Sequence, residues 1–255
     1  MDLINTTILL FLDYPDIINA CKGVPDFFRL CNKPYFWALK ADQDFNISAT
    51  ELLLVPGSNN KKRYEFIYNI KDPNKGLVKA AKLGILSLVK YYFKQGADLH
   101  DRGEWSLGWA ANNGHLDVVK YLIEQGADLH AGDEFALRWA ANNGHLDVVK
   151  YLVDVVNKGR ASHVFLVEHG ADLHVRDEEA LRWAAANGHL DVIKYLVEHG
   201  ANIHDRNDDA LKRAAINGKL DVVKYLLEQG ADLSVLLSNP NGYPKNIKIY
   251  LEQFL

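Results

Sequence analysis

Histidine is the residue type in this chain that most directly raises the question of chemistry. Ten histidines are present, and seven recur at equivalent places in repeated segments, namely His100, His130, His174, His204, His115, His145 and His189. Nitrogens that share one zinc ion at about 2.0–2.1 Å must lie within roughly 3.5 Å of each other, whereas stacked helices lie about 8–10 Å apart. We therefore interpret these histidines as turn and capping residues and expect no metal site.

Patterns for catalysis are also missing from the sequence. It contains no HExxH motif, no phosphate-binding loop and no nucleophile placed beside a base. The repeated aspartates are explained by helix capping. We expect no catalytic residue and no cofactor. An enzyme is a distant third hypothesis, after the two binding functions given at the end of this section.

The elements that position these residues form a repeat. The pentapeptide GADLH or a close variant begins at five glycines with steps of 30, 44, 30 and 30 residues, at Gly96, Gly126, Gly170, Gly200 and Gly230. A second block, such as NNGHLDVVKYL from Asn112 and Asn142, lies between these marks. A fixed period in this range is typical of a solenoid, whose units are stable only when stacked.

Each unit is predicted to contain two short helices. In one copy Asp133 is expected to cap the first helix and Gly144 to end it, with an apolar stripe between them. The second helix follows directly, with apolar residues at helical spacing from Leu146 to Val153. Small residues should let neighbouring helices approach closely, at Ala110, Ala111, Ala140, Ala141, Ala184, Ala185, Ala214 and Ala215. The predicted fold class is all-α.

These blocks, GADLH followed by ALRWAANNGHLDVVKYL, resemble the ankyrin repeat over about Asp72 to Leu233. The resemblance implies an ankyrin-repeat α-solenoid of five units over residues 72–235 and a role in binding proteins. Because the ankyrin period is about 33 residues, a step of 30 implies shortened hairpins between units. Ala136–Arg138 stands where the family has Thr-Pro-Leu-His. The phrasing ALRWAAANGHLDVIKYLVEHGA looks like the ankyrin proteins of giant DNA viruses.

One unit carries 14 extra residues, over about 154–167, with Gly159 near their middle. We expect a lengthened second helix or a helix-loop-helix there. It is either an insertion tolerated on the outer face or a dedicated binding protrusion.

Both ends depart from the repeat. Pro73 to Gly96 keeps only the repeat's skeleton and is predicted to be an entry cap. Residues 236–255 form a predicted exit cap, with one amphipathic helix from Tyr243 to Leu255. Residues 46–71 are predicted to be a packed connector with a helix from Lys61 to Ile70.

Residues 1–45 carry no repeat and are predicted to form three short helices, with breaks near Pro15, Pro25 and Pro34. The order ILLFLDYPDIINACKGVPDFFRLCNKPYFW resembles an F-box. That resemblance implies binding to the Skp1 adaptor of ubiquitin ligases, with candidate contacts Leu9, Leu12, Ile17, Phe28 and Trp37. The alternative is that the same apolar residues bury themselves as a structural cap.

Candidate partner-binding residues occupy one equivalent position in five successive units, namely Lys79, Trp109, Trp139, Trp183 and Arg213. The tryptophans could simply pack the core. Lys and Arg at the two ends of the row, however, indicate that the position reaches solvent, and Trp and Arg are enriched in binding hot spots. Arg138 and Arg182 form a second basic row, which could pair with acidic residues at the helix starts, Glu134, Glu178 and Asp208.

Charge and hydropathy argue against nucleic acid and membranes as binding partners. A net charge of −4 gives no electrostatic footprint for nucleic acid. The longest apolar run, Ile8 to Leu12, is far shorter than the roughly 20 residues that cross a bilayer. Two cysteines, Cys21 and Cys31, are interpreted as reduced thiols. We expect an intracellular monomer, in the host cytoplasm if the chain is viral.

Two functions follow as hypotheses. The chain is either an adaptor that brings a captured protein to a Skp1-type ubiquitin ligase, or a scaffold or inhibitor that only binds its partner.

Overall fold

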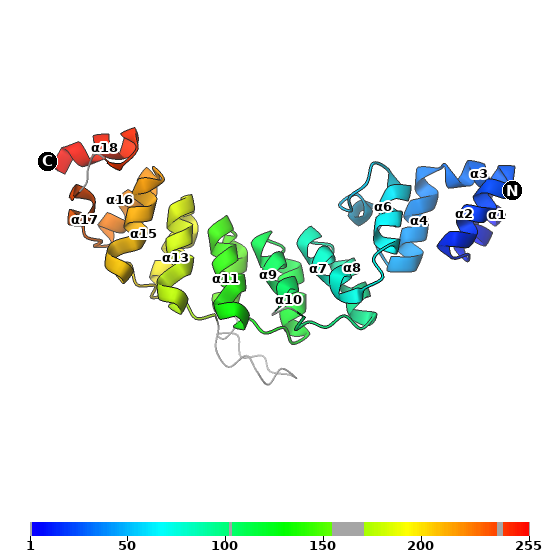
Figure 1. The fold of residues 1–255 in the computed structure, drawn as a ribbon, viewed down its shortest axis with the longest axis horizontal. Helices are drawn as coiled ribbons and strands as arrows, with labels where there is room; N and C mark the ends of the chain where they lie inside the picture. The colour runs from blue at the N-terminus through cyan, green and yellow to red at the C-terminus, as the bar shows by residue number, and fades with distance from the viewer. Residues whose placement is uncertain (1, 102–103, 155–170, 239–241, 255) are drawn as a thin grey trace. The chain divides into compact units, whose positions relative to one another are not determined.

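The computed structural model describes residues 2–101, 104–154, 171–238 and 242–254 (Figure 1). All regular structure in these ranges is helical, which confirms the predicted all-α class. The chain divides into two compact units, Met1–Leu99 and His100–Leu255. The division falls after the entry cap, so this first ankyrin-like repeat belongs to the same compact unit as the N-terminal helices.

The N-terminal unit contains the helices α1 (Asp2–Leu10), α2 (Tyr14–Gly23), α3 (Pro25–Cys31), α4 (Pro34–Phe45), α5 (Ala49–Leu52), α6 (Asn60–Tyr68), α7 (Pro73–Leu83) and α8 (Leu86–Lys94). Residues 1–45 thus hold four helices, and the expectation of three is wrong. Each proline break starts a new helix, because Pro15, Pro25 and Pro34 all lie in a first turn, where proline is tolerated.

Aromatic side chains make up much of the core of this unit. Phe36 and Trp37 of α4 and Tyr64 of α6 are almost fully buried. The Tyr64 ring lies 5.3 Å from that of Trp37 and 5.2 Å from that of Phe45, centroid to centroid. The segment between α4 and α7 is therefore packed against α4, as a connector with its own buried side chains.

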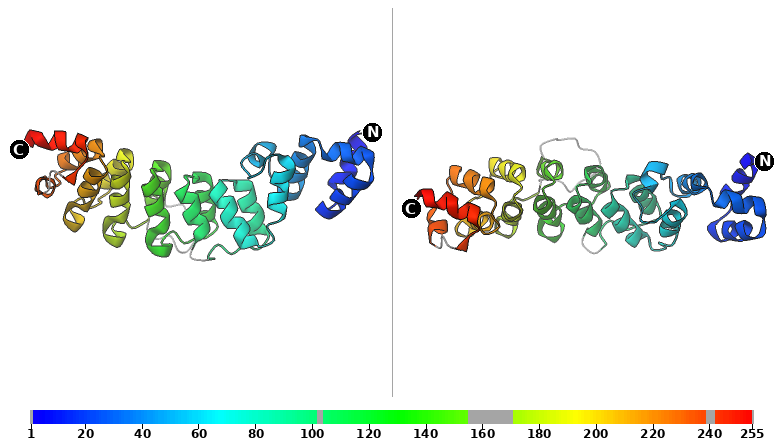
Figure 2. Two further views of the ribbon diagram at one scale, coloured as in Figure 1. Left: turned by 45° about the horizontal axis from the view of Figure 1, so that its top comes forward. Right: turned by 90° about the horizontal axis from the view of Figure 1, so that it is seen from above.

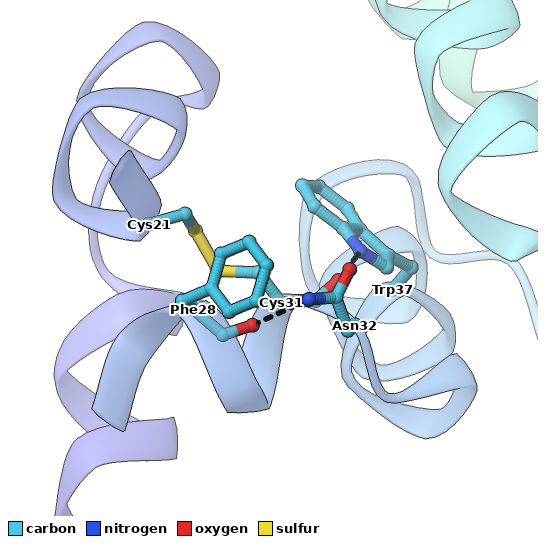
Figure 3. Close-up of a disulfide and its surroundings, with 5 residues drawn as sticks. All are labelled: Cys21, Phe28, Cys31, Asn32 and Trp37. Carbon is cyan, nitrogen blue, oxygen red and sulfur yellow. Dashed lines mark hydrogen bonds between the residues drawn. A yellow bond between two sulfur atoms is a disulfide. The ribbon is translucent and has the colours of Figure 1, made fainter. Parts of the chain in front are cut away.

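A disulfide joins Cys21 of α2 to Cys31 of α3, with a Cα–Cα distance of 6.2 Å (Figure 3). The interpretation of both cysteines as reduced thiols is therefore wrong. The two residues are ten apart in sequence, and the turn between α2 and α3 brings their side chains together. The disulfide removes the thiol-based argument for a reducing compartment.

The C-terminal unit contains α9 (Trp105–Asn112), α10 (Leu116–Glu124), α11 (Ala131–Asn143), α12 (Leu146–Asp154), α13 (Val175–Asn187), α14 (Leu190–Glu198), α15 (Asp205–Ile216), α16 (Leu220–Glu228), α17 (Ser234–Leu237), α18 (Lys245–Leu251) and the 3₁₀ helix η3 (Glu252–Phe254). The first helices of successive pairs, α9, α11, α13 and α15, pack in order as one layer. The helices α10, α12, α14 and α16 form the second layer, which Figure 2 shows from above.

Small buried residues hold the first layer together. The alanine pairs of α9, α11, α13 and α15 are all completely inaccessible to solvent, which fits their predicted role in close helix approach. Gly144 ends α11 with a left-handed φ of 77°, as predicted. A side chain there would also collide with the imidazole of His189, so glycine is needed for space as well as for conformation.

The turn before each first helix differs from the expected short hairpin. No strand occurs in the described residues, and the backbone makes a left-handed turn instead. Gly132, Asp133 and Glu134 have φ values of 61°, 54° and 58°. Arg206 to Asp208 do the same before α15. The expectation that Asp133 caps α11 is wrong, because Asp133 lies inside this turn.

Lysine ammonium groups of the second layer lie over tyrosine rings of the next helix. The distances to the ring centroids are 5.5 Å for Lys120–Tyr151, and 5.6 Å for Lys150–Tyr195, Lys194–Tyr225 and Lys224–Tyr250. Tyr250 belongs to α18, so the C-terminal helix continues the series of cation–π contacts. Ile247 and Leu251 of that helix are fully buried, as a capping helix requires.

The predicted insertion over 154–167, including Gly159, lies outside the described residues except for Asp154.

Candidate functional site

Three tryptophans form the centre of the candidate binding surface on the C-terminal unit. Trp109, Trp139 and Trp183 occupy the same position in α9, α11 and α13, and all three are half-buried. The Trp109 and Trp139 rings meet edge to face at 5.2 Å between centroids. The row is therefore part of the packing and also reaches solvent.

Neighbouring aromatic residues extend the surface on one side only. Phe135 lies 4.3 Å from Trp139 between ring centroids, and Trp105 is 44% exposed. Gly108 makes room for the Phe135 ring, which a side chain at that position would strike. The equivalent positions in the next two units carry Glu179 and Asp209. The aromatic character of this position is therefore confined to α9 and α11.

Arg138 does not face a partner, and the expectation that it does is corrected. Its side chain is only 6% exposed. Its Nε and Nη2 donate to the backbone carbonyls of Asp133 and Gly132 at 2.7 and 2.8 Å. Its Nη1 donates to Glu179 at 2.5 Å in the next unit. Its guanidinium carbon lies 5.9 Å from the Trp183 ring centroid, so Arg138 supports the row from within.

Arg182 repeats this arrangement one unit later. It is buried, donates to the Arg176 carbonyl at 2.8 Å and pairs with Asp209 at 3.2 Å. The basic row therefore pairs across the units, but with Glu179 and Asp209 and not with the predicted Glu178 and Asp208. Burial opposes ionisation of Asp209, yet the hydrogen bonds from Arg213 and Arg182 outweigh it and lower its pKa.

The two ends of the predicted row are basic and reach solvent. Arg213 is 41% exposed, and its Nε donates to Asp209 at 2.6 Å. Lys79 belongs to the N-terminal unit, where its exposed ammonium lies 5.0 Å from the centroid of Phe66.

The acidic residue at the start of each first helix is buried and paired with a histidine, which the sequence analysis missed. The residues are Glu104, Glu134, Glu178 and Asp208, all 3–4% exposed. Each pairs with the histidine four residues before it, for example Glu134 with His130 at 2.5 Å. Each also accepts a backbone N–H from the turn of the next unit, as Glu178 does from Asn202 at 3.0 Å. The regular His-x-x-x-Glu/Asp spacing was the available signal.

Burial and pairing change the titration of two of these carboxylates and of one histidine. Burial raises the pKa of Glu104 and Glu134 and outweighs their hydrogen bonds. The bond to Glu178 raises the pKa of His174 above its ordinary value of 6.5. His145 and His189, which precede the second helices α12 and α14, contact backbone instead, at the carbonyls of Asn112 and Asn142. No cluster of three metal-ligating side chains occurs in the described residues.

The five predicted Skp1 contacts of the N-terminal unit differ in their exposure. Leu9, Ile17 and Trp37 are at most 2% exposed and belong to the core, where Trp37 Nε1 donates to the Cys31 carbonyl at 2.7 Å (Figure 3). Leu12 is half-buried. Only Phe28 is largely exposed, at 59%. The buried residues can shape a docking surface but cannot touch a partner, which corrects their predicted role as direct contacts.

Comparison with known families accounts for the repeats. A model described as ankyrin repeats (3 copies) matches residues 36–133, 77–162 and 155–236, which together span most of the chain. The chain belongs to the ankyrin repeat family. The first ankyrin match begins at Phe36, within α4, so it takes in the connector as well as the entry cap. No curated protein matches the chain.

Ankyrin repeats indicate a protein–protein interaction module, and ankyrin proteins are generally binding scaffolds without catalysis. Within the described residues, none of the helices has the length and apolar character needed to cross a bilayer.

Proposed function

We propose that the chain is a non-catalytic binding protein that holds a partner on the face of α9, α11 and α13 bearing Trp109, Trp139 and Trp183. The observation that carries this proposal is the half-exposure of three tryptophans in one continuous row. Tryptophan is enriched in binding hot spots because it supplies a large contact area with few torsions to immobilise.

The row is also held in place before any partner arrives. The Trp139 ring contacts the rings of Trp109 and Phe135. Arg138, which lies close to the Trp183 ring, is held by three hydrogen bonds. A preorganised surface loses less conformational entropy on binding.

Replacing Trp139 and Trp183 with lysine tests this surface. Partner proteins captured from extracts of the source cells should be lost from the double variant, while its circular dichroism stays that of the native chain. Tyr121→Lys, on the second layer, is the matched control and should retain them. Loss of helical signal in the double variant, or unchanged capture, would reject the row as a binding surface.

We further propose that the N-terminal unit is the second docking surface, for Skp1, which would make the chain a substrate-recruiting adaptor. Supporting this is a concentration of exposed apolar side chains on α1 to α4 and their connections, namely Ile8 (47%), Phe11 (78%), Val24 (42%), Phe28 (59%), Tyr35 (46%) and Leu39 (46%). Exposed apolar residues in such number are typical of interaction sites. Viral origin and a host-cytoplasmic location remain hypotheses that rest on the sequence resemblance.

The alternative is a scaffold or inhibitor in which residues 1–45 are a cap. Burial of Leu9, Ile17 and Trp37 favours it, because these side chains serve the chain's own core. Binding of purified Skp1 to the chain distinguishes the adaptor from the scaffold. An adaptor should bind Skp1, lose it in a Phe11→Ser/Phe28→Ser variant and keep it in Ile216→Ser, which changes a residue of α15 that is as exposed as Phe28. Failure of the intact chain to bind Skp1 would leave the scaffold as the function.

A further inference from the structure

The N-terminal unit contains a pocket that the repeat surface does not use. Its volume is about 520 Å³, within the range of small-molecule sites. It is lined by residues between Leu10 and Gln95, including the rings of Tyr14, Phe45, Tyr64, Tyr68 and Tyr91. All of these residues belong to the same compact unit.

The aromatic rings form a continuous wall. Tyr68 lies 4.8 Å from Tyr14 between centroids, and Tyr14 lies 5.6 Å from Tyr64. Phe45 connects Tyr64 to Tyr91 at 5.2 and 5.3 Å. Such a wall favours a flat aromatic group, which can stack on one ring and meet the edge of another.

The acidic groups of the pocket are already engaged. Asp13 accepts the backbone N–H of Asp16 at 3.3 Å as the cap of α2. Asp44 accepts Lys40 Nζ at 2.7 Å with one carboxylate oxygen and the Tyr64 hydroxyl at 2.5 Å with the other. Both oxygens of Asp44 are therefore occupied, and Asp13 is tied to the start of α2.

The groups with spare capacity are donors. Lys40 is only 3% exposed, and its ammonium donates to the Leu10 carbonyl and to Asp44, which leaves the third of its N–H bonds. Lys71 at the rim lies 3.5 Å from the centroid of Tyr68. In the part of the chain that the structure describes, the hydroxyls of Tyr68 and Tyr91 make no hydrogen bond. Burial, aided by the charge of Asp44, raises the pKa of Tyr91, which keeps that hydroxyl a donor.

We propose that this pocket binds an aromatic carboxylate, with its ring against the tyrosine wall and its carboxylate accepting hydrogen bonds from Lys40, Lys71 and Tyr91. The N–H and O–H donors without an acceptor favour an anionic ligand, and the wall of rings favours a flat aromatic one. The same chemistry is presented by a free aromatic acid and by the C-terminal aromatic residue of a peptide.

Three probes with one aromatic body test the assignment. Calorimetric titration of the full chain with 2-naphthoate, 2-naphthamide and 2-naphthylmethylammonium compares an anion, a neutral group and a cation. Because a hydrogen bond to a charged group contributes about 1.5–3 kcal/mol, 2-naphthoate should bind at least about tenfold more tightly than either of the others. Tightest binding of the ammonium, equal binding of all three or binding of none would overturn the proposal.

Two conservative variants then locate the ligand. Tyr91→Phe keeps the ring contact with Phe45 and removes only the hydroxyl, and Lys71→Gln removes the rim charge together with its contact to the Tyr68 ring. Each should weaken 2-naphthoate about tenfold or more. Tyr121→Phe, at the equivalent position of α10, and Lys94→Gln, an exposed lysine of α8, should leave the affinity unchanged. Equal affinity of all four variants would place the ligand elsewhere and reject this pocket.

N-acetyl-phenylalanine and its C-terminal amide distinguish the source of the ligand. Preference for 2-naphthoate over N-acetyl-phenylalanine supports a free aromatic acid. The reverse preference, with the amide bound at least about tenfold more weakly, supports a peptide C-terminus.

Discussion

Glu178 accepts a hydrogen bond from the backbone N–H of Asn202, 24 residues further along the chain, at 3.0 Å. Glu104 does the same for Asp128 at 3.1 Å, and Asp208 for Asp232 at 3.3 Å. The turn of each unit is thus completed by a carboxylate of the preceding unit. This contact, together with the alanine seam, makes neighbouring units depend on each other.

The alanine seam should tolerate no charge. Ala184→Asp puts a carboxylate at a site with no solvent exposure, and an unpaired buried charge costs about 3–5 kcal/mol. We expect thermal unfolding by circular dichroism to show a large loss of stability. Ala186→Asp, half-buried two residues further along α13, is the matched control and should be much milder. Equal melting temperatures for the two variants would mean that Ala184 is not at the seam.

The pairing of His174 with Glu178 should make stability depend on pH near neutrality. Because the folded pKa of His174 is raised above 6.5, its contribution is fully present below pH 6.5 and is lost as pH rises through the folded value. We expect the melting temperature to fall over that window. His174→Gln should flatten the fall, whereas Glu228→Gln, an exposed carboxylate of α16, should not. A variant profile that parallels the native one would contradict the pairing.

The lysine–tyrosine contacts of the second layer should each add a modest stabilisation. Methionine at Lys120, Lys150 and Lys194 keeps most of the side-chain length and removes the charge, at a cost of about 0.5–1 kcal/mol per exposed contact. Denaturant unfolding of the triple variant measures the sum. Lys94→Met serves as the control for loss of an exposed charge. A triple variant as stable as this control would show that the contacts contribute nothing.

The disulfide should stabilise the α2–α3 pair. Closing a short loop typically contributes about 2–4 kcal/mol. A reducing agent should therefore speed amide hydrogen exchange in α2 and α3 and leave α14 and α16 unchanged. The Cys21→Ser/Cys31→Ser variant should exchange at the faster rate under both conditions. Detection of two free thiols in the unreduced native protein would show that the bond does not form.

The sequence predicted the regular parts of the fold because their signal is local. The alanine pairs, the apolar stripe from Leu146 and the left-handed Gly144 follow from helical periodicity and backbone preference, and the structure contains all three. The left-handed turn at Asp133 did not follow. Left-handed residues normally occur singly, so three in succession at Gly132, Asp133 and Glu134 were not expected. The hydrogen bond that Glu134 accepts from the next turn is invisible in a single repeat.

The candidate site was predicted in part for a similar reason. Equivalent positions located the tryptophan row, since repetition itself marks a position. Burial of Arg138 depended on a partner 41 residues away, Glu179, which no local pattern indicates. The disulfide was missed because two cysteines in a chain of this length give no framework from which to infer pairing.

The completion of each turn by the unit before it also bears on how such a chain can change in length. In each interior repeat a carboxylate accepts a hydrogen bond from the following repeat, and a backbone N–H donates one to the preceding repeat. If one 30-residue repeat is duplicated or lost, the repeats that become neighbours can therefore form the same contact. Recombination between copies can therefore lengthen or shorten the array while both terminal segments keep their original neighbours.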